Sequence, residues 1–515
     1  MHDLVLGGGT VYDGRGARGV SADVAVVDGR IRAVGRGLGA ARRVIDVGGL
    51  AVAPGFVDAH THSDLMPLTG PAQPFKLLQG VTTEVVGNCG ISFAPVDTEA
   101  AETLQSIYGD LACGTELRAR SFGEYLDEVQ AAGPMTNIAA LVGHGTLRVV
   151  ANGMRERLRE GALGRMRALL GEALAAGAFG LSSGLIYPPG SYADTAELVA
   201  LAEVLRPWGR VYATHLRDEG DRLLPALDEA IEVAEGAGVR LQVSHCKVTG
   251  RRNHGSAPAL LDRLRAARER GVDVRGDAYP YTSGATVLVA LLPPAAAAGG
   301  SNALAGRLAD AGEREALRAS ASAGRGLWSA VTPADVLVSR HADGAVVGRT
   351  LADLSRGQDP WLVLCRIIAS DPAATAVLTA MDLGDVCTIL ADPLIGIGSD
   401  SIPSAGPGHP RSYGCFPEFL GRYVRELGVV DLPVAVRKLT FDNAARFGLA
   451  DRGRLEAGVV ADVCVFDPEV IAHPGGYADP RRAPVGVEHV LLAGQPVVVG
   501  GEFSGDRVGQ VLRAR

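Results

Sequence analysis

The sequence has no apolar stretch long enough to cross a membrane as a helix. Its most apolar run, residues 287–298, is interrupted by Pro293 and Pro294, and a spanning helix needs roughly 18 apolar residues in a row. The chain begins Met1-His2-Asp3, without the basic region and apolar core of a secretory signal. These absences predict a cytoplasmic protein that has no membrane partner.

Lysine is nearly absent, because Lys76, Lys247 and Lys438 are the only ones in the chain and arginine supplies almost all the positive charge. The formal net charge of -8 is dispersed and includes no basic stripe, so we expect no nucleic-acid partner. The seven cysteines are odd in number and form no Cys-x-x-Cys pair, which argues against a disulfide framework or a structural zinc knuckle. Nothing in the sequence defines an oligomeric state.

The two ends of the chain share a pattern of short strands separated by glycine turns. It appears at residues 2–6, 24–27, 30–34 and 42–47, and again at 461–466, 487–493 and 495–499. The pattern predicts a small composite β-sandwich domain made from residues 1–53 and 452–515.

Between these ends, from residue 54 to 451, strand-like and helix-like segments alternate as in parallel βα units. Eight candidate strands lie at residues 50–57, 81–86, 137–142, 178–182, 211–214, 240–244, 272–276 and 394–398. Eight units predict an α/β fold of the (β/α)8 TIM-like barrel type, in which chemistry lies at the C-terminal ends of the strands. Residues 285–378 break the rhythm and predict an insertion, or lid, between strands seven and eight.

The ends of the first two predicted strands carry side chains that can bind metal. Strand one runs into His60-Thr61-His62, and in an extended backbone side chains two residues apart point to the same side. The alternative is that both histidines only form hydrogen bonds in a loop. Strand two runs into Gly87-Asn88-Cys89-Gly90, where the glycines allow a sharp turn that presents the thiol. By itself Cys89 would more often be an ordinary buried cysteine, but a thiolate is also a strong zinc ligand.

Three further strand ends add to this group. His215 follows strand five, His245 follows strand six and Asp400 follows strand eight. One histidine at such a position is usually a core residue, whereas two on consecutive strands are hard to explain by packing. A buried carboxylate is costly unless it meets a cation or is fully hydrogen-bonded. The set of nitrogen, sulfur and oxygen donors suits zinc, and its members are His60, His62, Cys89, His215, His245 and Asp400. His144, at the end of strand three, is a weaker candidate for a seventh ligand.

With these residues in place, the chain resembles the amidohydrolase superfamily and, within it, the D-aminoacylase family of N-acyl-D-amino-acid deacylases. The resemblance covers essentially the whole chain. The His-x-His motif and Asp400 are signals of the superfamily and say little about substrate. The motifs more specific to the family are Gly87-Asn88-Cys89-Gly90, His215-Leu216-Arg217-Asp218-Glu219, Ser244-His245-Cys246-Lys247 and His409-Pro410-Arg411-Ser412-Tyr413-Gly414.

The resemblance implies how a metal would be held. Most binuclear members of the superfamily bridge their metals with a carbamylated lysine on strand four, but this chain has no lysine between Lys76 and Lys247. The family's cysteine solution, with Cys89 as ligand or bridge, is the consistent alternative. It implies one tightly held Zn2+ on Cys89, His215 and His245. His60, His62 and Asp400 would border this ion and could hold a second, weaker one.

For the substrate, the resemblance implies that Tyr187, Lys247, Tyr279, Met381 and Arg411 line the binding site. Lys247 and Arg411 would be the partners of a substrate carboxylate. Two positions depart from the family pattern, since an expected arginine falls on Thr388 and an expected serine falls on Ala285. Whether a free α-carboxylate is required is therefore left open.

These features predict a zinc-dependent hydrolase that acts on a small-molecule substrate. It would cleave the amide bond of N-acyl-D-amino acids, or closely related N-acyl compounds, to a carboxylate and a free amine. Zinc brings the pKa of bound water close to neutrality, and Asp400 would take the proton of that water and pass it to the leaving nitrogen. We expect a preference for apolar amino-acid side chains.

Two other functions are compatible with part of the pattern. A cyclic-amide hydrolase of the hydantoinase or dihydroorotase kind would share the barrel, but the missing strand-four lysine counts against it. A non-catalytic binding protein on the same fold would be expected to have lost ligands, whereas all six positions are filled here.

Overall fold

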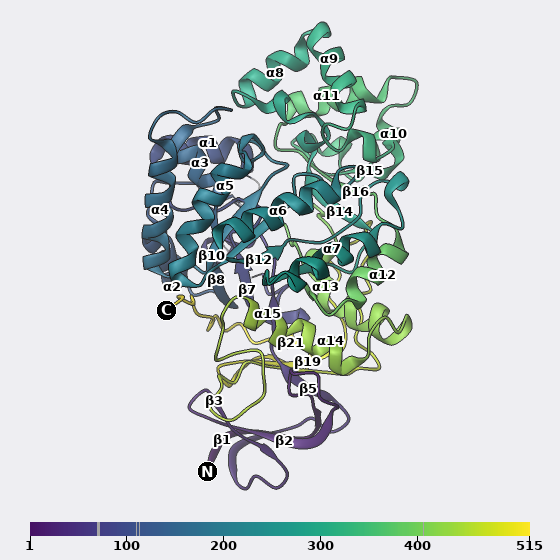
Figure 1. Ribbon diagram of the computed structural model, residues 1–515. Coiled ribbons are helices and arrows are strands. Elements are labelled where there is room, and N and C mark those ends of the chain that lie inside the picture. Colours follow the sequence, from purple (N-terminus) through teal and green to yellow (C-terminus); the bar gives the residue numbers. More distant parts are fainter. Residues whose placement is uncertain (70–72, 110, 113, 405) are drawn as a thin grey trace.

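A computed structural model describes residues 1–69, 73–109, 111–112, 114–404 and 406–515 of the chain (Figure 1). None of the helices in these ranges is long and apolar enough to cross a membrane. The α-helices are α1 (Thr98–Tyr108), α2 (Phe122–Ala132), α3 (His144–Asn152), α4 (Ala162–Ala176), α5 (Thr195–Ala202), α6 (Leu223–Ala237), α7 (Ala257–Glu269), α8 (Ser301–Ala309), α9 (Ala311–Ser322), α10 (Leu351–Leu354), α11 (Pro360–Ser370), α12 (Leu383–Ala391), α13 (Arg411–Glu418), α14 (Leu432–Leu439) and α15 (Phe441–Arg446).

Two parallel sheets form the centre of the molecule. The larger one has the order β17 (Ile395–Ile397), β13 (Val274–Ala278), β12 (Arg240–Val243), β11 (Val211–His215), β10 (Gly180–Gly184) and β9 (Val142–Gly143). The smaller one has the order β6 (Phe56–Asp58), β7 (Val81–Val86) and β8 (Asn137–Ala140). Helices α5, α6 and α7 connect successive parallel strands, as the alternating sequence pattern predicts, and the two sheets are consistent with a barrel.

The two parallel sheets meet at both of their edges. At one edge only Leu141 separates β8 from β9. At the other edge the backbone N–H of Asp400 donates to the carbonyl of His60 at 2.8 Å. The buried Asn443 amide spans the same edge, because it donates to the carbonyl of Val57 at 2.7 Å and to that of Ile397 at 2.8 Å. The strands that carry the first and last candidate ligands are thus tied directly to each other.

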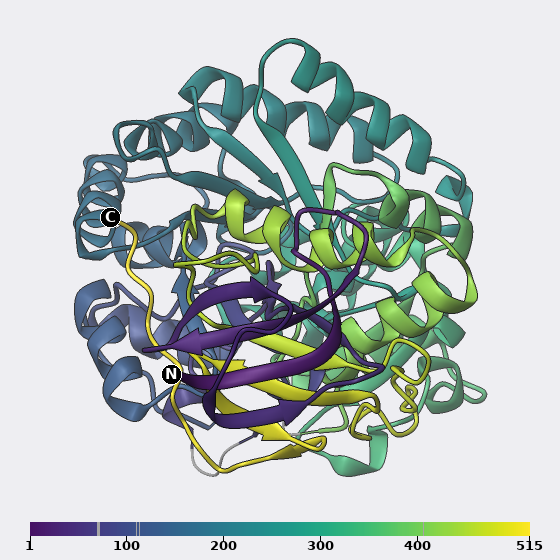
Figure 2. The same cartoon turned by 90° about the horizontal axis from the view of Figure 1, so that it is seen from below.

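Both termini contribute strands to one nine-stranded sheet (Figure 2). Its main path is β21 (Glu502–Phe503), β20 (Gln495–Val499), β19 (Val487–Leu492), β18 (Val463–Phe466), β5 (Ala51–Pro54), β1 (His2–Val11), β2 (Val20–Val27) and β3 (Arg30–Gly35), and β4 (Ala41–Asp46) pairs with β1. The antiparallel pair of β5 with β18 joins the N-terminal strands to the C-terminal ones.

The single strand predicted for residues 50–57 is in fact two strands in different sheets. β5 belongs to the terminal sheet and β6 to the smaller parallel sheet. Gly55 lies between them, and a Cβ atom at this position would come within 2.2 Å of the Thr82 side chain. The apolar run predicts burial correctly, but both sheets are buried here, so hydrophobicity alone does not reveal where the chain passes from one to the other.

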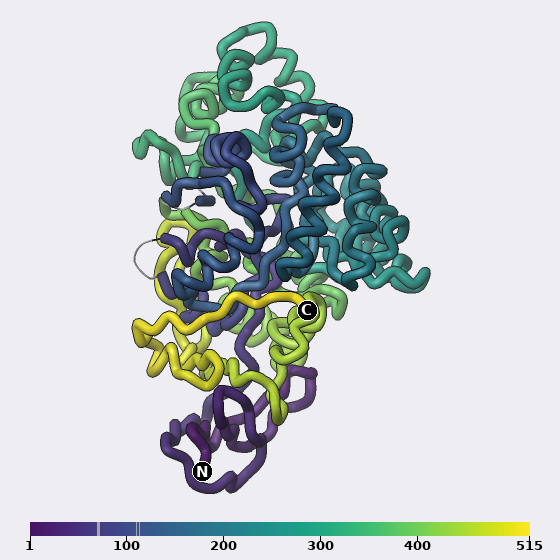
Figure 3. The backbone as a smooth tube through the Cα atoms, turned by 90° about the vertical axis from the view of Figure 1, so that its left-hand side faces the viewer, coloured from purple at the N-terminus to yellow at the C-terminus, as the bar shows by residue number. Residues whose placement is uncertain are grey.

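The segment between β13 and β17 forms an antiparallel sheet of its own, with the order β14 (Ser283–Val287), β16 (Thr375–Thr379) and β15 (Val336–Arg340). Helices α8 to α11 accompany it, and a separate apolar cluster that includes Leu291, Trp361 and Leu364 fills its interior. Figures 1 and 3 show this segment at the end of the molecule opposite to the terminal sheet.

The scarce lysines are placed inward. Lys76 Nζ contacts Asp58 Oδ2 at 2.5 Å and Ser399 Oγ at 2.8 Å, so it links the ends of β6 and β17. Lys438 Nζ donates to the main-chain carbonyls of Asp392, just before β17, and of Ile395, the first residue of β17. These contacts tie the last parallel strand to its surroundings, and the third lysine, Lys247, belongs to the candidate site.

Lys438 should make stability depend on pH. Burial lowers its pKa from the usual 10.5 to about 8. Between these values the unfolded chain binds more protons than the folded one, so the free energy of unfolding rises with pH across this window. This increase in the free energy of unfolding is at most about 3 kcal/mol. It is lost again as the pH falls from 10.5 to 8. We expect the urea midpoint of wild type to rise, relative to that of Lys438→Met, when the pH is raised from 7.5 to 10. A difference between the two midpoints that is the same at both pH values would contradict this assignment.

Candidate metal centre and its cavity

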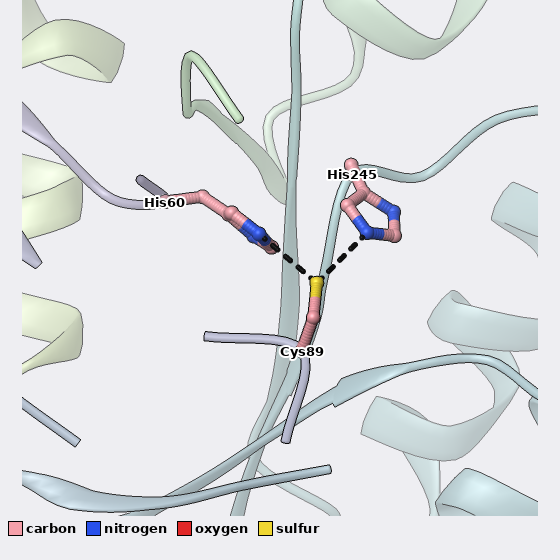
Figure 4. A group of neighbouring side chains, drawn as sticks. All are labelled: His60, Cys89 and His245. Atoms are coloured by element: carbon pink, nitrogen blue, oxygen red, sulfur yellow. Dashed lines mark hydrogen bonds between the residues drawn. The ribbon is translucent and has the colours of Figure 1, made fainter. Parts of the chain in front are cut away.

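Three imidazoles surround the thiol of Cys89. Its Sγ lies 3.3 Å from His60 Nε2, 3.4 Å from His245 Nε2 and 3.7 Å from His215 Nδ1. Figure 4 shows the rings of His60 and His245 directed at the sulfur atom from two sides. The donor atoms of His60, Cys89 and His245 all lie within 4.8 Å of one another, which is a separation that one metal ion can bridge.

A second group of donors shares His60 with the first. His62 Nε2 lies 3.4 Å from Asp400 Oδ1, and His60 Nε2 lies 3.6 Å from the same oxygen. All six side chains that the sequence predicts as ligands are buried; five of them make up these two groups, and His215 joins His245 and Glu219 in a third. The ligand set implied by the sequence, Cys89 with His215 and His245, did not include His60. In the structure His60 lies nearer to the thiol than His215 does.

The backbone at three of these residues is strained. Among the described residues, the non-glycine residues with positive φ are Asp28, Cys89, His245, Asp400 and Ala493. The φ angles of Cys89, His245 and Asp400 are 51°, 35° and 49°. A non-glycine residue in this region costs of order 1 kcal/mol or more, and such residues cluster at functional sites. Three strand ends therefore adopt a costly conformation at the point where the donors converge.

Charges on the donors depend on one another. Burial opposes ionisation of the Cys89 thiol, but His60 and His245 outweigh burial and hold its pKa well below the usual range. Burial likewise opposes protonation of His62, yet hydrogen bonding with Asp400 and Cys89 raises the pKa of this histidine to about 9. Burial also disfavours the Asp400 carboxylate, but Arg411 and the neighbouring histidines together outweigh burial, so the pKa of Asp400 lies well below its ordinary value. The site thus favours anionic sulfur and oxygen donors, which are the forms that bind a metal.

Two carboxylates that were not predicted as site residues contact these histidines, and one of them, Glu219, also lines the neighbouring cavity. Glu219 Oε1 lies 3.0 Å from His245 Nδ1 and 2.7 Å from Lys247 Nζ. Asp277 Oδ1 lies 3.3 Å from His60 Nδ1 and accepts the backbone N–H of His245 at 2.8 Å. Carboxylates in this position fix the orientation of ligand imidazoles. The signal available in the sequence was the place of Glu219, four residues after His215, and of Asp277 at the end of β13.

A cavity opens next to these donors, and its walls include most of the predicted substrate residues. Tyr187, Lys247, Tyr279 and Met381 line it together with His62, Cys89, His215, His245 and Asp400. The rest of the wall is largely apolar, with Ile91, Ile107, Ile186, Val287, Leu378 and Ile402 among its members. A molecule bound here would meet a few charged and polar groups at one end and hydrocarbon elsewhere, as is typical of small-molecule sites.

Arg411 lies behind the cavity wall. Its Nη2 lies 2.9 Å from Asp400 Oδ2, and its guanidinium group lies 4.6 Å from the centre of the Tyr279 ring, on the face of that ring. The side chain is fully buried and is not among the residues that line the cavity. In this arrangement Arg411 is the partner of Asp400.

The two departures from the family pattern fall at different places. Ala285 lines the cavity. Thr388 is exposed on α12, where its hydroxyl donates to the Gly384 carbonyl at 2.8 Å. Counting residues back from Asp400 therefore did not identify a position in the site.

His144 is held outside the group of donors. Its Nε2 contacts Glu197 Oε1 at 2.8 Å, and Arg148 pairs with the same carboxylate at 2.9 Å. These contacts join α3 to α5 and give His144 a structural partner of its own.

Comparisons with known proteins agree with the geometry. The model of the amidohydrolase family matches residues 43–498. The D-aminoacylase of Alcaligenes xylosoxydans xylosoxydans is 37% identical over 512 residues, which is 99% of this chain and 97% of that protein. A crystal structure of D-aminoacylase is 36% identical over the full length of both chains, with a TM-score of 0.87.

A further relative was solved with a metal and an inhibitor. The N-acyl-D-glutamate deacylase of Bordetella bronchiseptica, in complex with zinc and a phosphonate that mimics its tetrahedral intermediate, is 36% identical over the full length of both chains, with a TM-score of 0.84. The strand-end donors, the cavity beside them and the full-length similarity agree. The chain belongs to the amidohydrolase family, in the group that contains D-aminoacylase and N-acyl-D-glutamate deacylase.

Proposed function

We propose that this chain hydrolyses the amide bond of N-acyl-D-amino acids, releasing a carboxylate and a free D-amino acid. The observation that carries the proposal is the Cys89 thiol, which lies within 3.7 Å of three imidazoles on the wall of a cavity that also exposes Lys247 and Asp400. Full-length similarity to a D-aminoacylase and to an N-acyl-D-glutamate deacylase supports the substrate class.

The donor set fits zinc. Thiolate and imidazole together favour zinc over magnesium or calcium, which prefer oxygen ligands. Cys89, His215 and His245 would hold the tightly bound ion, and His60 lies close enough to take part. His62 and Asp400, with His60, would border it and supply a second, weaker site. The strand-four position offers only serines in Gly180–Gly184, so Cys89 is the residue able to act as a bridge.

When bound, zinc polarises the acyl carbonyl and brings the pKa of water toward neutrality. Asp400 is the proposed general base and acid, because it reaches the cavity and stays ionised. It would accept the proton of the attacking water on a carboxylate oxygen and return it to the leaving nitrogen. Arg411 holds the second oxygen of Asp400 at 2.9 Å and thereby fixes the direction of the carboxylate.

Substrate orientation would depend on Lys247. It is the cation that lines the cavity, and Glu219 holds its ammonium group at 2.7 Å. Lys247 would bind the α-carboxylate, with Tyr279 beside it. Tyr187 and Met381 would form the walls on either side, and the apolar lining favours apolar substrate groups.

We infer that the two parallel sheets form a closed (β/α)8 barrel. The contacts between the two parallel sheets at both edges support closure. Residues 1–53 and 452–515 would form the composite β domain. Residues 285–378 would form the insertion over the C-terminal strand ends, where the candidate ligands lie.

Metal dependence and substrate class can be tested together. The protein should hydrolyse N-acetyl-D-leucine and N-acetyl-D-methionine in preference to the L enantiomers. A chelator should abolish this activity, and one equivalent of Zn2+ should restore it, because the buried thiolate of Cys89 and carboxylate of Asp400 favour a divalent cation. Hydantoins serve as the control substrate. Hydrolysis of hydantoins without hydrolysis of linear N-acyl amino acids would favour the cyclic-amide alternative.

Cys89 should decide zinc retention. Cys89→Ala removes the sulfur donor of the group, so we expect zinc content to fall below half of the wild-type stoichiometry and kcat/KM to fall at least about 100-fold. Metal analysis by mass spectrometry measures the first effect. Cys387→Ala, in the partly exposed surface of α12, is the matched control and should keep both. Wild-type zinc content in the Cys89 variant would remove this residue from the ligand set.

Asp400 should affect turnover more than metal content. Asp400→Asn keeps the shape of the side chain and removes the proton acceptor, so kcat should fall about 10²- to 10⁴-fold while zinc bound by Cys89, His215 and His245 remains. Steady-state kinetics with parallel metal analysis separate the two effects. An Asn variant with ordinary turnover would show that another group moves the proton.

A further inference from the structure

A second hollow, here called the apolar groove, adjoins the catalytic cavity. The two share Ile107, Tyr108, Tyr187 and Val287 as lining residues. Beyond these the groove is lined by Met154, Val289, Ala297, Leu304 and Pro372, among others. It therefore lies between α1 and the start of α8, where the insertion approaches the helices of the central fold (Figure 1).

The groove offers almost no polar group to a ligand. None of the described side chains that line it is charged. Its serines bond to each other, because Ser106 Oγ lies 3.1 Å from Ser301 Oγ. The Tyr108 hydroxyl donates to the Pro188 carbonyl at 3.3 Å, and the Tyr187 hydroxyl lies 3.1 Å from Thr286 Oγ1. Hydroxyls that already have partners leave hydrocarbon as the chemistry that the groove can bind.

The position of the groove indicates which part of a substrate would enter it. Lys247, Tyr279 and Met381 line the catalytic cavity but not the groove. In a trans amide the acyl chain and the α-carbon leave on opposite sides of the C–N bond. If Lys247 holds the α-carboxylate, the acyl chain is directed away from Lys247, toward Tyr187 and the groove.

We propose that the apolar groove binds the hydrocarbon chain of the acyl group, so that N-acyl-D-amino acids with medium or long acyl chains are the preferred substrates. This inference rests on the proposed deacylase function. The Ser106–Ser301 contact ties α1 to the insertion at the lining of the groove. The insertion thereby selects the acyl chain.

The first test is a series of acyl lengths on one amino acid. With N-acetyl-, N-butyryl-, N-hexanoyl-, N-octanoyl- and N-decanoyl-D-leucine, kcat/KM should rise about two- to fourfold per added methylene until the groove is filled. A companion series that lengthens the D-amino-acid side chain under a constant acetyl group should show no comparable rise. A flat acyl series, or a rise confined to the side-chain series, overturns the proposal.

The second test blocks the groove. Ala297→Trp and Val289→Trp should lower the ratio of kcat/KM for N-decanoyl- over N-acetyl-D-leucine at least about tenfold, because the added ring occupies the space of several methylenes. Asn302→Trp, at an exposed position of α8, is the matched control and should keep the wild-type ratio. Melting temperatures check that the variants fold. A wild-type ratio in both folded groove variants contradicts the proposal.

Direct binding separates failure of the groove from failure of the function. The zinc-loaded Asp400→Asn protein should bind N-decanoyl-D-leucine at least about tenfold more tightly than N-acetyl-D-leucine in calorimetry. If no acyl derivative is cleaved by the wild-type holoenzyme, the deacylase function is wrong, and the groove is still judged by this comparison. Equal affinities overturn the acyl-chain assignment even if N-acetyl-D-leucine is cleaved.

Discussion

The candidate site depends on compensation among charges that are removed from water. Cys89, His60, His62, His245 and Asp400 are all at least nine-tenths buried, and an isolated charge in such a position would cost several kcal/mol. Each donor is therefore tolerated because a neighbour carries the opposite charge or accepts its proton. A divalent cation adds the positive charge that an ionised thiol and carboxylate favour. Removing one member leaves its partners uncompensated, so the group behaves as a unit.

This electrostatic arrangement needs a rigid support. Cys89, His245 and Asp400 hold positive φ angles, and such strain persists only where the surrounding structure fixes it. The strands behind them provide this support, because Asn443 and Lys76 tie β6 to β17 through hydrogen bonds with Val57, Ile397, Asp58 and Ser399. Lys76 and Lys438 form hydrogen bonds with β17 or with residues next to it. The third lysine, Lys247, pairs with Glu219 beside the donors. The scarcity of lysine thus coincides with its use at buried positions of the central sheets and the site.

The sequence predicted the elements that repeat and missed the contacts that depend on side-chain direction. Buried parallel strands followed by helices leave a strong periodic pattern, so the strand ends at His60, Cys89, His215, His245 and Asp400 could be located. The passage of the chain from one sheet to another at Gly55 could not, because both sheets require apolar residues. Arg411 was predicted to contact substrate, but its direction follows from packing on Tyr279 and pairing with Asp400. Thr388 was misplaced because counting along the chain does not tell which face of α12 a residue occupies, and this residue lies on the exposed face.

The donors and the apolar walls come from different parts of the molecule, and this separation has a consequence for how substrate range can vary. The donors lie at the ends of parallel strands, whose positions are fixed by ladder hydrogen bonds and by the strain and charge compensation described above. Val287, Leu378 and Ala285 come from the antiparallel sheet of the insertion, which has its own apolar core around Trp361. Changes in that core can move the wall of the cavity while the parallel strands keep their register. Affinity for hydrocarbon changes by less than 1 kcal/mol per methylene, so substrate range can shift gradually on the insertion while the strand-end chemistry stays constant.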